Sequence, residues 1–227
     1  ITTKQVHYLL KKIINSTFNK EGFPKSRNIR QLNFYLKYLI LIREWLKESQ
    51  NDIPEYLDEI IYHIGQAYSL INRNPGVSYF FNGNQISNNS DFSNYLKRLG
   101  YNFKNESHEV GEYIFLNNKK LFFAMDLGPS PEKKFSDNYQ AGTLSFEIIS
   151  NGKKIISNSG YFQNYKHQLN LICKSTACQS TLVLNNSSST QCLKKIDSTS
   201  QTIGATKVIN KNVNITKKHW MISAEHD

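Results

Sequence analysis

The order of hydrophobic and polar positions divides the chain into two parts with different periodicity. In the first 75 residues, apolar side chains recur at steps of three and four, which is the spacing of amphipathic helices. Three such series are present: Val6, Leu9, Leu10, Ile13 and Ile14; Leu32, Tyr35, Leu39, Ile42 and Leu46; and Leu57, Ile60, Ile61, Ile64 and Ile71. Short polar connections separate them, so we predict three consecutive helices that pack as antiparallel neighbours.

After Pro75 the pattern changes, first to a stretch rich in Asn, Ser and Gly and then to a period of two. We predict a short helix over residues 91–99 and two hairpins, one turning at Asn117-Asn118 and one at Asn151-Gly152. Further strands are predicted over residues 181–184 and 219–222. Helices followed by strands, without alternation, indicate an α+β chain of two domains. We expect residues 1–75 to be helical, 76–112 to form the linker and domain junction, and 113–227 to form an antiparallel β-domain.

The two ends of the sequence suggest that it continues in both directions. The chain starts at Ile1 with no initiator Met and no export-signal pattern, and it stops soon after the strand-like run Trp220-Met221-Ile222. We therefore expect a fragment of a longer protein. No uninterrupted run of 18 apolar residues is present, so we predict no membrane span.

The charge balance favours anionic partners. The sequence has 28 Lys and Arg residues against 18 Asp and Glu, a formal net charge of +10. Lysines predominate and are scattered along the chain, whereas base-edge recognition relies on clustered arginines. This pattern favours a general attraction for anions over sequence-specific nucleic-acid binding, and we predict no nucleic-acid partner. A lysine- and asparagine-rich composition without functional meaning is the alternative interpretation.

Familiar catalytic and metal-binding motifs are missing from the sequence. The three cysteines, Cys173, Cys178 and Cys192, follow no common zinc spacing, so we interpret them as free thiols. No histidine belongs to a nucleophile or zinc motif, and no glycine-rich phosphate loop is present. We therefore predict no cofactor.

One polar stretch, Ser26-Arg27-Asn28, stands at the start of the second predicted helix and has two interpretations. Arg27 and Arg30, beside a positive helix end, can attract an anionic group. Alternatively, Ser26 or Asn28 caps the helix and the arginine side chains are solvated. The sequence leaves both open.

Four later blocks, in this order, resemble the heparinase II/III family of polysaccharide lyases: residues 123–129, 139–148, 158–160 and 175–184. The stretch Ser26-Arg27-Asn28 resembles a motif of a bacterial branch of the family, and the whole resemblance spans roughly residues 20 to 227. It implies the C-terminal part of an (α/α) toroid followed by an antiparallel β-sandwich, with the rest of the toroid preceding this chain and packing on its helices. It also implies an acidic polysaccharide partner and a place in the cell envelope or periplasm.

The chain departs from the family at its polar positions. Relatives carry His-x-His-x-Asp where residues 138–142 stand, Asp-Ser-Gly at 158–160, and Ala-His followed by Asn or Ser and then Thr at 178–181. The resemblance places the ligands of a structural zinc at Gln140, Asn158 and Gln179. Neutral amides are poor zinc ligands, so we predict no bound metal. We expect these three side chains to converge and share hydrogen bonds instead.

The resemblance implies lyase chemistry, in which the proton beside a uronate carboxylate is removed and the 4-linked sugar is expelled. Arg27 and Asn28 are the predicted groups for neutralising the carboxylate, and Tyr139 and Tyr161 are acids by position. Gln140 and Gln179 complete the predicted catalytic site. Two functions follow: a lyase acting on an acidic, uronate-containing polysaccharide, or a non-catalytic glycan-binding or surface-polysaccharide assembly protein that kept the fold.

Overall fold

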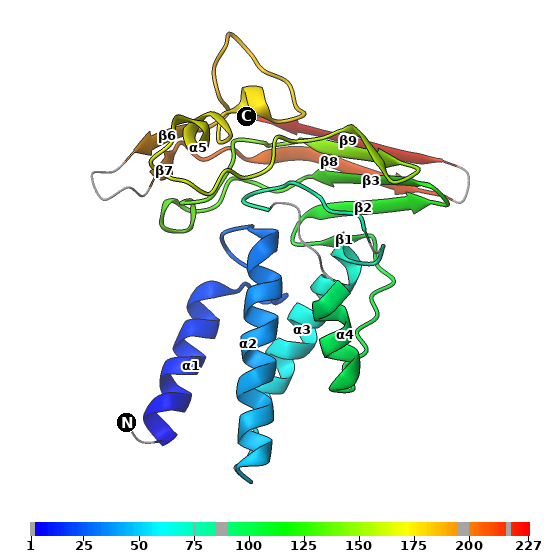
Figure 1. The fold of residues 1–227 in the computed structure, drawn as a ribbon. Helices are drawn as coiled ribbons and strands as arrows, with labels where there is room; N and C mark the ends of the chain where they lie inside the picture. The colour runs from blue at the N-terminus through cyan, green and yellow to red at the C-terminus, as the bar shows by residue number, and fades with distance from the viewer. Residues whose placement is uncertain (1–2, 75, 85–89, 195–199, 217–218) are drawn as a thin grey trace.

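A computed structural model describes residues 3–74, 76–84, 90–194, 200–216 and 219–227. A set of helices lies on one side of a layer of antiparallel strands, and α1 begins at the end of the helical layer that is farthest from the strands (Figure 1). The helices are α1 (Thr3–Thr17), α2 (Ile29–Glu48), α3 (Glu55–Ile71), α4 (Ser90–Arg98) and, within the β-part, α5 (Gln168–Ile172). Among the described residues, no helix has the length and apolar content needed to cross a membrane.

The three predicted N-terminal helices are confirmed, and α4 confirms the short fourth one. Helices α1, α2 and α3 run alternately toward and away from the strands (Figure 1). Their apolar faces are buried where α2 meets α3: Leu36, Ile40, Leu57 and Ile64 are fully enclosed. Apolar side chains are also exposed on two of these helices: Val6, Leu9 and Ile13 on α1 and Phe34, Tyr38 and Trp45 on α2 are each about half exposed.

The main sheet has five antiparallel strands in sequence order: β1 (Glu109–Val110), β2 (Tyr113–Asn118), β3 (Leu121–Asp126), β4 (Phe146–Ser150) and β5 (Lys153–Ile156). The predicted Asn151-Gly152 turn is confirmed, with φ of 50° and 76° as a type I′ hairpin requires. The predicted turn at Asn117-Asn118 is wrong. Asn118 still pairs with Leu121, so the strand continues and the chain turns at Lys119-Lys120.

A second β-layer covers the sheet on the side away from the helices (Figure 1). It is the hairpin of β8 (Val208–Ile215) and β9 (Trp220–His226), which confirms the strand predicted over residues 219–222. Ile114 and Leu116 of β2 pack against its apolar side chains. An ion pair between Lys211 and Glu109 also joins β8 to β1. Strands β6 (Gln191–Lys194) and β7 (Ser200–Ile203) form a separate pair.

The strand predicted over residues 181–184 is wrong. Leu184 makes one isolated bridge to Ser187, and Leu182 and Leu184 are exposed. Because these apolar side chains find neither a partner strand nor a layer to pack against, the segment stays irregular.

The helix-facing side of the sheet shares one hydrophobic core with the helices. Tyr113, Phe115, Ala124 and Ile149 belong to the same buried cluster as the apolar faces of α2 and α3. Thus the even positions of β2 face the second β-layer and the odd positions face the helices. The result is a helical layer followed by an antiparallel β-sandwich, as predicted, with a buried junction between them.

Candidate functional site

Arg27 lies at the centre of the junction. It directly precedes Asn28, the N-cap of α2, and its backbone is left-handed, with φ of 59°. The side chain is 8% exposed and lies over the ring of Tyr113, with 4.6 Å between the guanidinium carbon and the ring centroid. Its Nη1 donates to the carbonyl oxygen of Gly111 at 3.1 Å and to Glu112 at 3.2 Å, and its Nη2 pairs with Asp126. A buried cation requires such partners.

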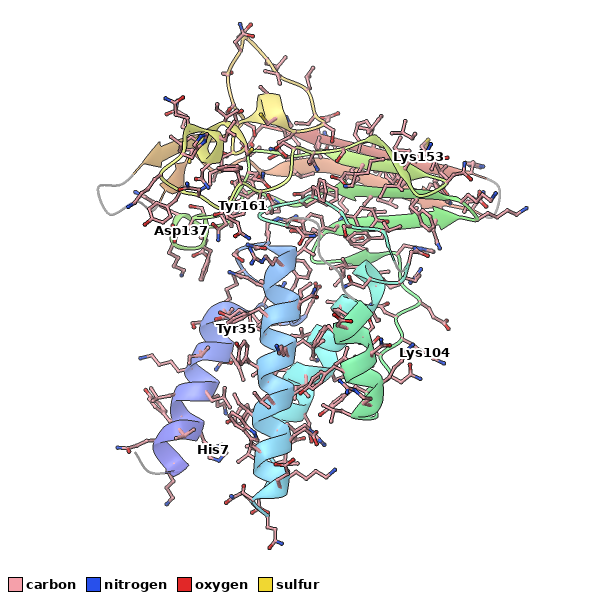
Figure 2. All side chains as sticks on the ribbon, viewed as in Figure 1. His7, Tyr35, Lys104, Asp137, Lys153 and Tyr161 are labelled. Atoms are coloured by element: carbon pink, nitrogen blue, oxygen red, sulfur yellow. The ribbon has the colours of Figure 1, made fainter. Side chains whose placement is uncertain are left out.

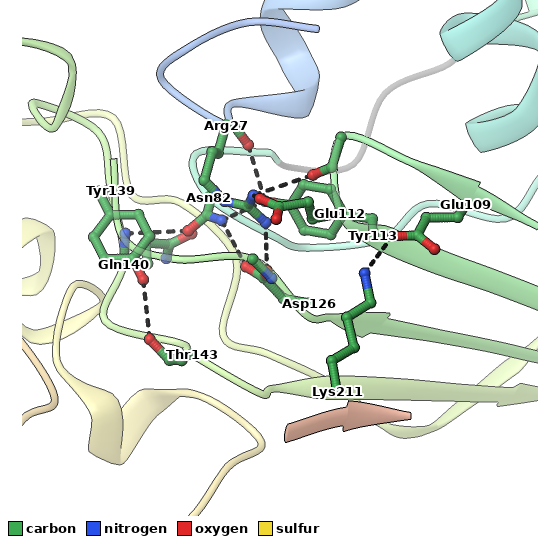
Figure 3. Close-up of polar contacts among 12 residues, drawn as sticks. Arg27, Asn82, Glu109, Glu112, Tyr113, Asp126, Tyr139, Gln140, Thr143 and Lys211 are labelled. Carbon is green, nitrogen blue, oxygen red and sulfur yellow. Dashed lines mark hydrogen bonds and ion pairs between the residues drawn. The ribbon is translucent and has the colours of Figure 1, made fainter. Parts of the chain in front are cut away.

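Asp126, at the end of β3, is the buried partner in this network (Figure 3). Its carboxylate also accepts hydrogen bonds from Asn82 Nδ2 and from the backbone N–H of Gly128, each at 3.0 Å. Burial raises the pKa of Asp126, while the Arg27 guanidinium and these donors act in the opposite direction. Gly128 has no room for a side chain, because a Cβ would lie 1.8 Å from Arg27 Nη1. The guanidinium therefore packs directly against the backbone.

Asn82 and Tyr113 connect the ion pair to the rest of the junction (Figure 3). Asn82 Nδ2 donates to the Tyr113 hydroxyl, which donates in turn to the carbonyl oxygen of Arg27 at 3.0 Å. Burial raises the pKa of Tyr113, so its phenol remains protonated and available as this donor. The network holds the loop before α2, the segment around Asn82 and the ends of β2 and β3 together.

Gln140 joins three segments of chain through its amide group. Its Oε1 accepts from the backbone N–H of Gly83 at 3.0 Å, and its Nε2 donates to the carbonyl oxygens of Gly160 at 2.7 Å and Cys173 at 2.8 Å. Gln179 Nε2 donates to the same Cys173 oxygen at 2.8 Å. The two glutamines thus converge on one backbone acceptor, as expected, but the expected hydrogen bond between the amides is not among the described contacts.

Asn158 lies next to this pair without bonding to either glutamine. Its Oδ1 accepts from the backbone N–H and the hydroxyl of Ser180, both at 3.0 Å, and Ser180 follows Gln179 directly. Its Nδ2 is buried and has no hydrogen-bond partner. The three side chains are therefore connected through backbone groups: Gln140 and Gln179 share the Cys173 oxygen, and Asn158 bonds to the residue after Gln179. The described contacts include no hydrogen bond between two of the amides.

The residues at these positions do not fit the zinc that the family resemblance implies. Zinc needs donors with a free lone pair, yet Gln140 Nε2 and Gln179 Nε2 are N–H donors turned toward a carbonyl oxygen. Across the described parts of the chain, no group of three His, Cys, Asp or Glu side chains is arranged to hold a metal ion. The amides act as hydrogen-bonding groups here.

The remaining predicted residues have different surroundings. Asn28 Oδ1 accepts from the N–H of Arg30 at 3.0 Å, which confirms the capping interpretation. Arg27, however, is not solvated: its charge is engaged by the enclosed Asp126 and by the half-exposed Glu112. Tyr139 is buried, with its hydroxyl 3.2 Å from Thr143, and burial raises its pKa.

Tyr161 has a more accessible position. It is half-buried, its hydroxyl donates to Asn138 Oδ1 at 2.8 Å, and in Figure 2 it lies near the boundary between the β-layer and the helices. The structure therefore brings Arg27, Asn28 and Gln140 together around Asn82-Gly83, with Gln179 joined through Cys173.

Sequence reasoning missed Asn82, Glu112 and Asp126 as parts of the site. Asn82-Gly83 has the composition of an ordinary turn, and Glu112 stands in a loop. Asp126 offered a signal, because a carboxylate directly after the apolar run Phe122 to Met125 needs a partner once the strand is buried.

A cleft of about 370 Å³ opens beside Arg27, between the loop before α2 and the sandwich. Arg27 and Lys25 line it together with three carboxylates, Glu21, Glu112 and Glu132. Glu112 is the accessible partner of Arg27, with its side chain 51% exposed against 2% for Asp126. A ligand in this cleft therefore has to pass or displace Glu112 to reach the Arg27 guanidinium.

Comparison with known proteins identifies the family. A family model described as heparinase II/III-like, C-terminal, matches residues 104–227. The chain belongs to this heparinase II/III-like family. The match covers the sandwich and the segment leading into it. A comparison with curated proteins finds no match.

Solved structures of heparinases share the fold. Heparan sulfate lyase HepC from Pedobacter heparinus has a TM-score of 0.67 at 12% identity, over 91% of this chain and 36% of its own. A structure of heparinase III gives 0.63 at 13% identity, over 91% and 38%. The heparinase III BT4657 gene product gives 0.63 at 15% identity, over 90% and 36%. The chain thus spans little more than a third of these proteins, and at such identities the likeness establishes the fold alone.

Proposed function

We propose that this heparinase II/III-like chain is part of a polysaccharide lyase that cleaves an acidic, uronate-containing polysaccharide by β-elimination. The supporting observation is the junction itself: Arg27, Asn28 and Gln140, predicted from separate blocks, meet between the helices and the sandwich. The structural neighbours include a heparan sulfate lyase, whose substrate is such a polymer. In this proposal the helices complete an (α/α) toroid whose other helices precede the chain, and the protein works in the cell envelope or periplasm.

Arg27 is the group that would neutralise the substrate carboxylate. Elimination transfers the proton beside this carboxylate to a base, which in this proposal belongs to the part of the toroid that precedes the chain, and a cation on the carboxylate stabilises the negative charge that develops. Glu112 now accepts from Nη1 and is half exposed, whereas Asp126 is enclosed. A uronate carboxylate entering the cleft would replace Glu112 on Nη1, while Asp126 keeps the guanidinium in place. Asn28 and Gln140 position the loops around it and do not need to touch the sugar.

Tyr161 is the phenol assigned to proton transfer at the leaving oxygen. It is half-buried and oriented by Asn138, in the segment where the family resemblance places a His. Tyr139, the other predicted acid, is buried, and its hydroxyl is hydrogen-bonded to Thr143. In this proposal it holds the segment from Tyr139 to Thr143 in place and does not contact the sugar. General acid catalysis by a positioned phenol contributes about 10²- to 10⁴-fold in rate.

A non-catalytic glycan-binding role is the second candidate. It is favoured by the charge balance at the site: Arg27 has two carboxylate partners, and both N–H groups of Gln140 are used by backbone carbonyls. Arg27 Nε is buried without a hydrogen-bond partner, but the other polar groups of the network are engaged, and such a network keeps its shape without a reactive group.

The discriminating experiment is ultraviolet detection of the unsaturated uronate product, with the full-length protein and a panel of uronate polymers. We expect product from at least one polymer, and a loss of about 100-fold or more in Tyr161→Phe. Tyr165→Phe, at an exposed position four residues later, is the matched control and should keep the activity. If no polymer yields product although one of them binds, the glycan-binding role replaces the lyase.

A further inference from the structure

A second cavity lies between α1 and α3, beneath the loop that leads to α2. Its volume is about 380 Å³, within the range of small-molecule sites. Its polar lining comes from three separate parts of the chain: Lys11 and Asn15 on α1, Lys20 and Lys25 in the loop, and Tyr56 and His63 on α3. Apolar side chains close the inner wall, with Ile14 and Phe18 buried.

The charge of this lining is positive. Three lysines face a single carboxylate, Glu59. Lys25 Nζ donates one hydrogen bond, to the carbonyl oxygen of Asn15 at 2.7 Å, and an ammonium has three N–H donors. Lys11 lies 5.8 Å from the ring centroid of Tyr56. The cavity therefore offers ammonium N–H donors next to the ring of Tyr56. These groups suit an anionic group, such as a sulfate or carboxylate, that is attached to a sugar ring.

The loop that supplies Lys20 and Lys25 is held in shape by its own hydrogen bonds. Asn19 Oδ1 accepts from the N–H groups of Glu21 at 3.0 Å and Phe23 at 2.8 Å, and Phe18 pairs with Pro24. Gly22 has φ of 71° and packs so closely on His63 that a Cβ would lie 2.5 Å from the histidine Cβ. A loop fixed to α3 in this way needs little ordering when a ligand binds.

The cleft beside Arg27 is lined by more carboxylates than cationic side chains. Glu21, Glu112 and Glu132 line it against Lys25 and Arg27, and Arg27 is also paired with the buried Asp126. The two hollows share Asn19 and Lys25, so they adjoin along the same loop. A chain of anionic sugars that reached both would find its stronger electrostatic attraction at the α1–α3 cavity.

We propose that the α1–α3 cavity is an anion subsite that binds a sulfate or carboxylate group of the polysaccharide through Lys11, Lys20 and Lys25. The proposal rests on the proposed function for the identity of the sugar. It assigns recognition of the anionic group to the helices, while the reacting uronate lies at the Arg27 cleft.

The test is calorimetric titration of the full-length protein with three probes: sodium sulfate, a sulfated heparan oligosaccharide and the same oligosaccharide after desulfation. The variants are Lys11→Gln, Lys20→Gln and the pair together. Both lysines are exposed, so the fold should survive, which circular dichroism checks. Lys12→Gln is the matched control, because Lys12 is the next residue of α1, equally exposed, and does not line the cavity.

We expect each substitution to weaken oligosaccharide binding roughly fivefold and the pair roughly 25-fold, with Lys12→Gln within about twofold of the unchanged protein. Weaker binding of the desulfated probe assigns the subsite to sulfate, and equal binding assigns it to carboxylate. Sodium sulfate competing in the unchanged protein but not in the double variant supports the oxyanion site.

Unchanged binding in the double variant would overturn the proposal, as would an equal loss in Lys12→Gln, which would mean general charge attraction alone. Its failure is separable from failure of the proposed function. Product formation with full affinity in the double variant removes the subsite and keeps the lyase, whereas lysine-dependent binding without product removes the lyase and keeps the subsite.

Discussion

Asp126 and Arg27 form a buried ion pair that joins the end of β3 to the residue just before the cap of α2. The two residues are 99 positions apart in the sequence, and neither side chain is more than 8% exposed. This charged contact joins the helical layer to the sandwich at the centre of their shared core.

Asp126→Asn should destabilise the protein strongly, because it leaves the buried Arg27 guanidinium with the half-exposed Glu112 as its one carboxylate partner among the described residues. Breaking a buried pair by removing one partner costs about 3–5 kcal/mol. Asp58→Asn is the control: Asp58 pairs with Arg43 on the surface, where a pair contributes about 0–1 kcal/mol. Urea unfolding of both variants measures the difference. Equal, small losses would mean that the Arg27–Asp126 pair adds nothing beyond a surface contact.

Gln140→Glu should also destabilise the fold, by about 2–4 kcal/mol, because a carboxylate oxygen would face the carbonyl oxygens of Gly160 and Cys173 in place of the N–H donors. Gln31→Glu on α2 is the matched control. There the Gln31 Oε1 accepts from the Ser26 hydroxyl at 2.6 Å, and a carboxylate accepts equally well. Thermal melts compare the two. A Gln140→Glu variant as stable as the control would show that the bonds from Gln140 Nε2 are dispensable.

Treatment with a metal chelator should leave the melting temperature unchanged. Neutral amides occupy the positions at which the family resemblance implies zinc ligands, and the N–H donors of Gln140 and Gln179 are turned to backbone oxygens. A structural zinc would instead be part of the folding free energy, so its removal would lower the melting temperature. A drop on chelation, or stoichiometric zinc by elemental analysis, would contradict the hydrogen-bond interpretation.

Stability should fall as the pH rises above about 10, the ordinary pKa of tyrosine. Burial raises the pKa values of Tyr79, Tyr113 and Tyr139 in the folded protein. Above that pH the unfolded chain loses these protons first and binds fewer of them than the folded chain, so each further step in pH favours unfolding. Tyrosinate absorbance and circular dichroism, followed together, measure this. Ionisation of every tyrosine near pH 10 with the native dichroism intact would refute it.

The sequence predicts much of the fold because periodicity records burial directly. Each of these local patterns fits one structure: the apolar series of α2 and α3 fit amphipathic helices, and Asn151-Gly152 fits a two-residue hairpin turn. The strand predicted over residues 181–184 was wrong because an apolar run forms a strand only when another strand is available to pair with it. The choice between Asn117-Asn118 and Lys119-Lys120 as the turn depended on register with β3, which composition does not carry.

The site was less predictable, since its contacts join distant segments. The family blocks identified Arg27 and Gln140, but the partners Asn82 and Asp126 come from segments 44 residues apart and share no motif. Arg27 also shows the limit of motif reasoning: its residue type indicated a group that binds anions, but not that two carboxylates of the same chain, Asp126 and Glu112, pair with it.

The core shared by the helices and the sheet has a consequence for how the chain comes apart. Tyr113, Phe115, Ala124 and Ile149 are covered by the helices and by Phe23, Tyr79 and Phe81 from the segments next to them. A chain shortened to residues 104–227, the extent of the family model, would leave that side of the sheet open to water. The segment that defines the family by sequence is therefore not an autonomous folding unit, and the chain should melt in a single cooperative step.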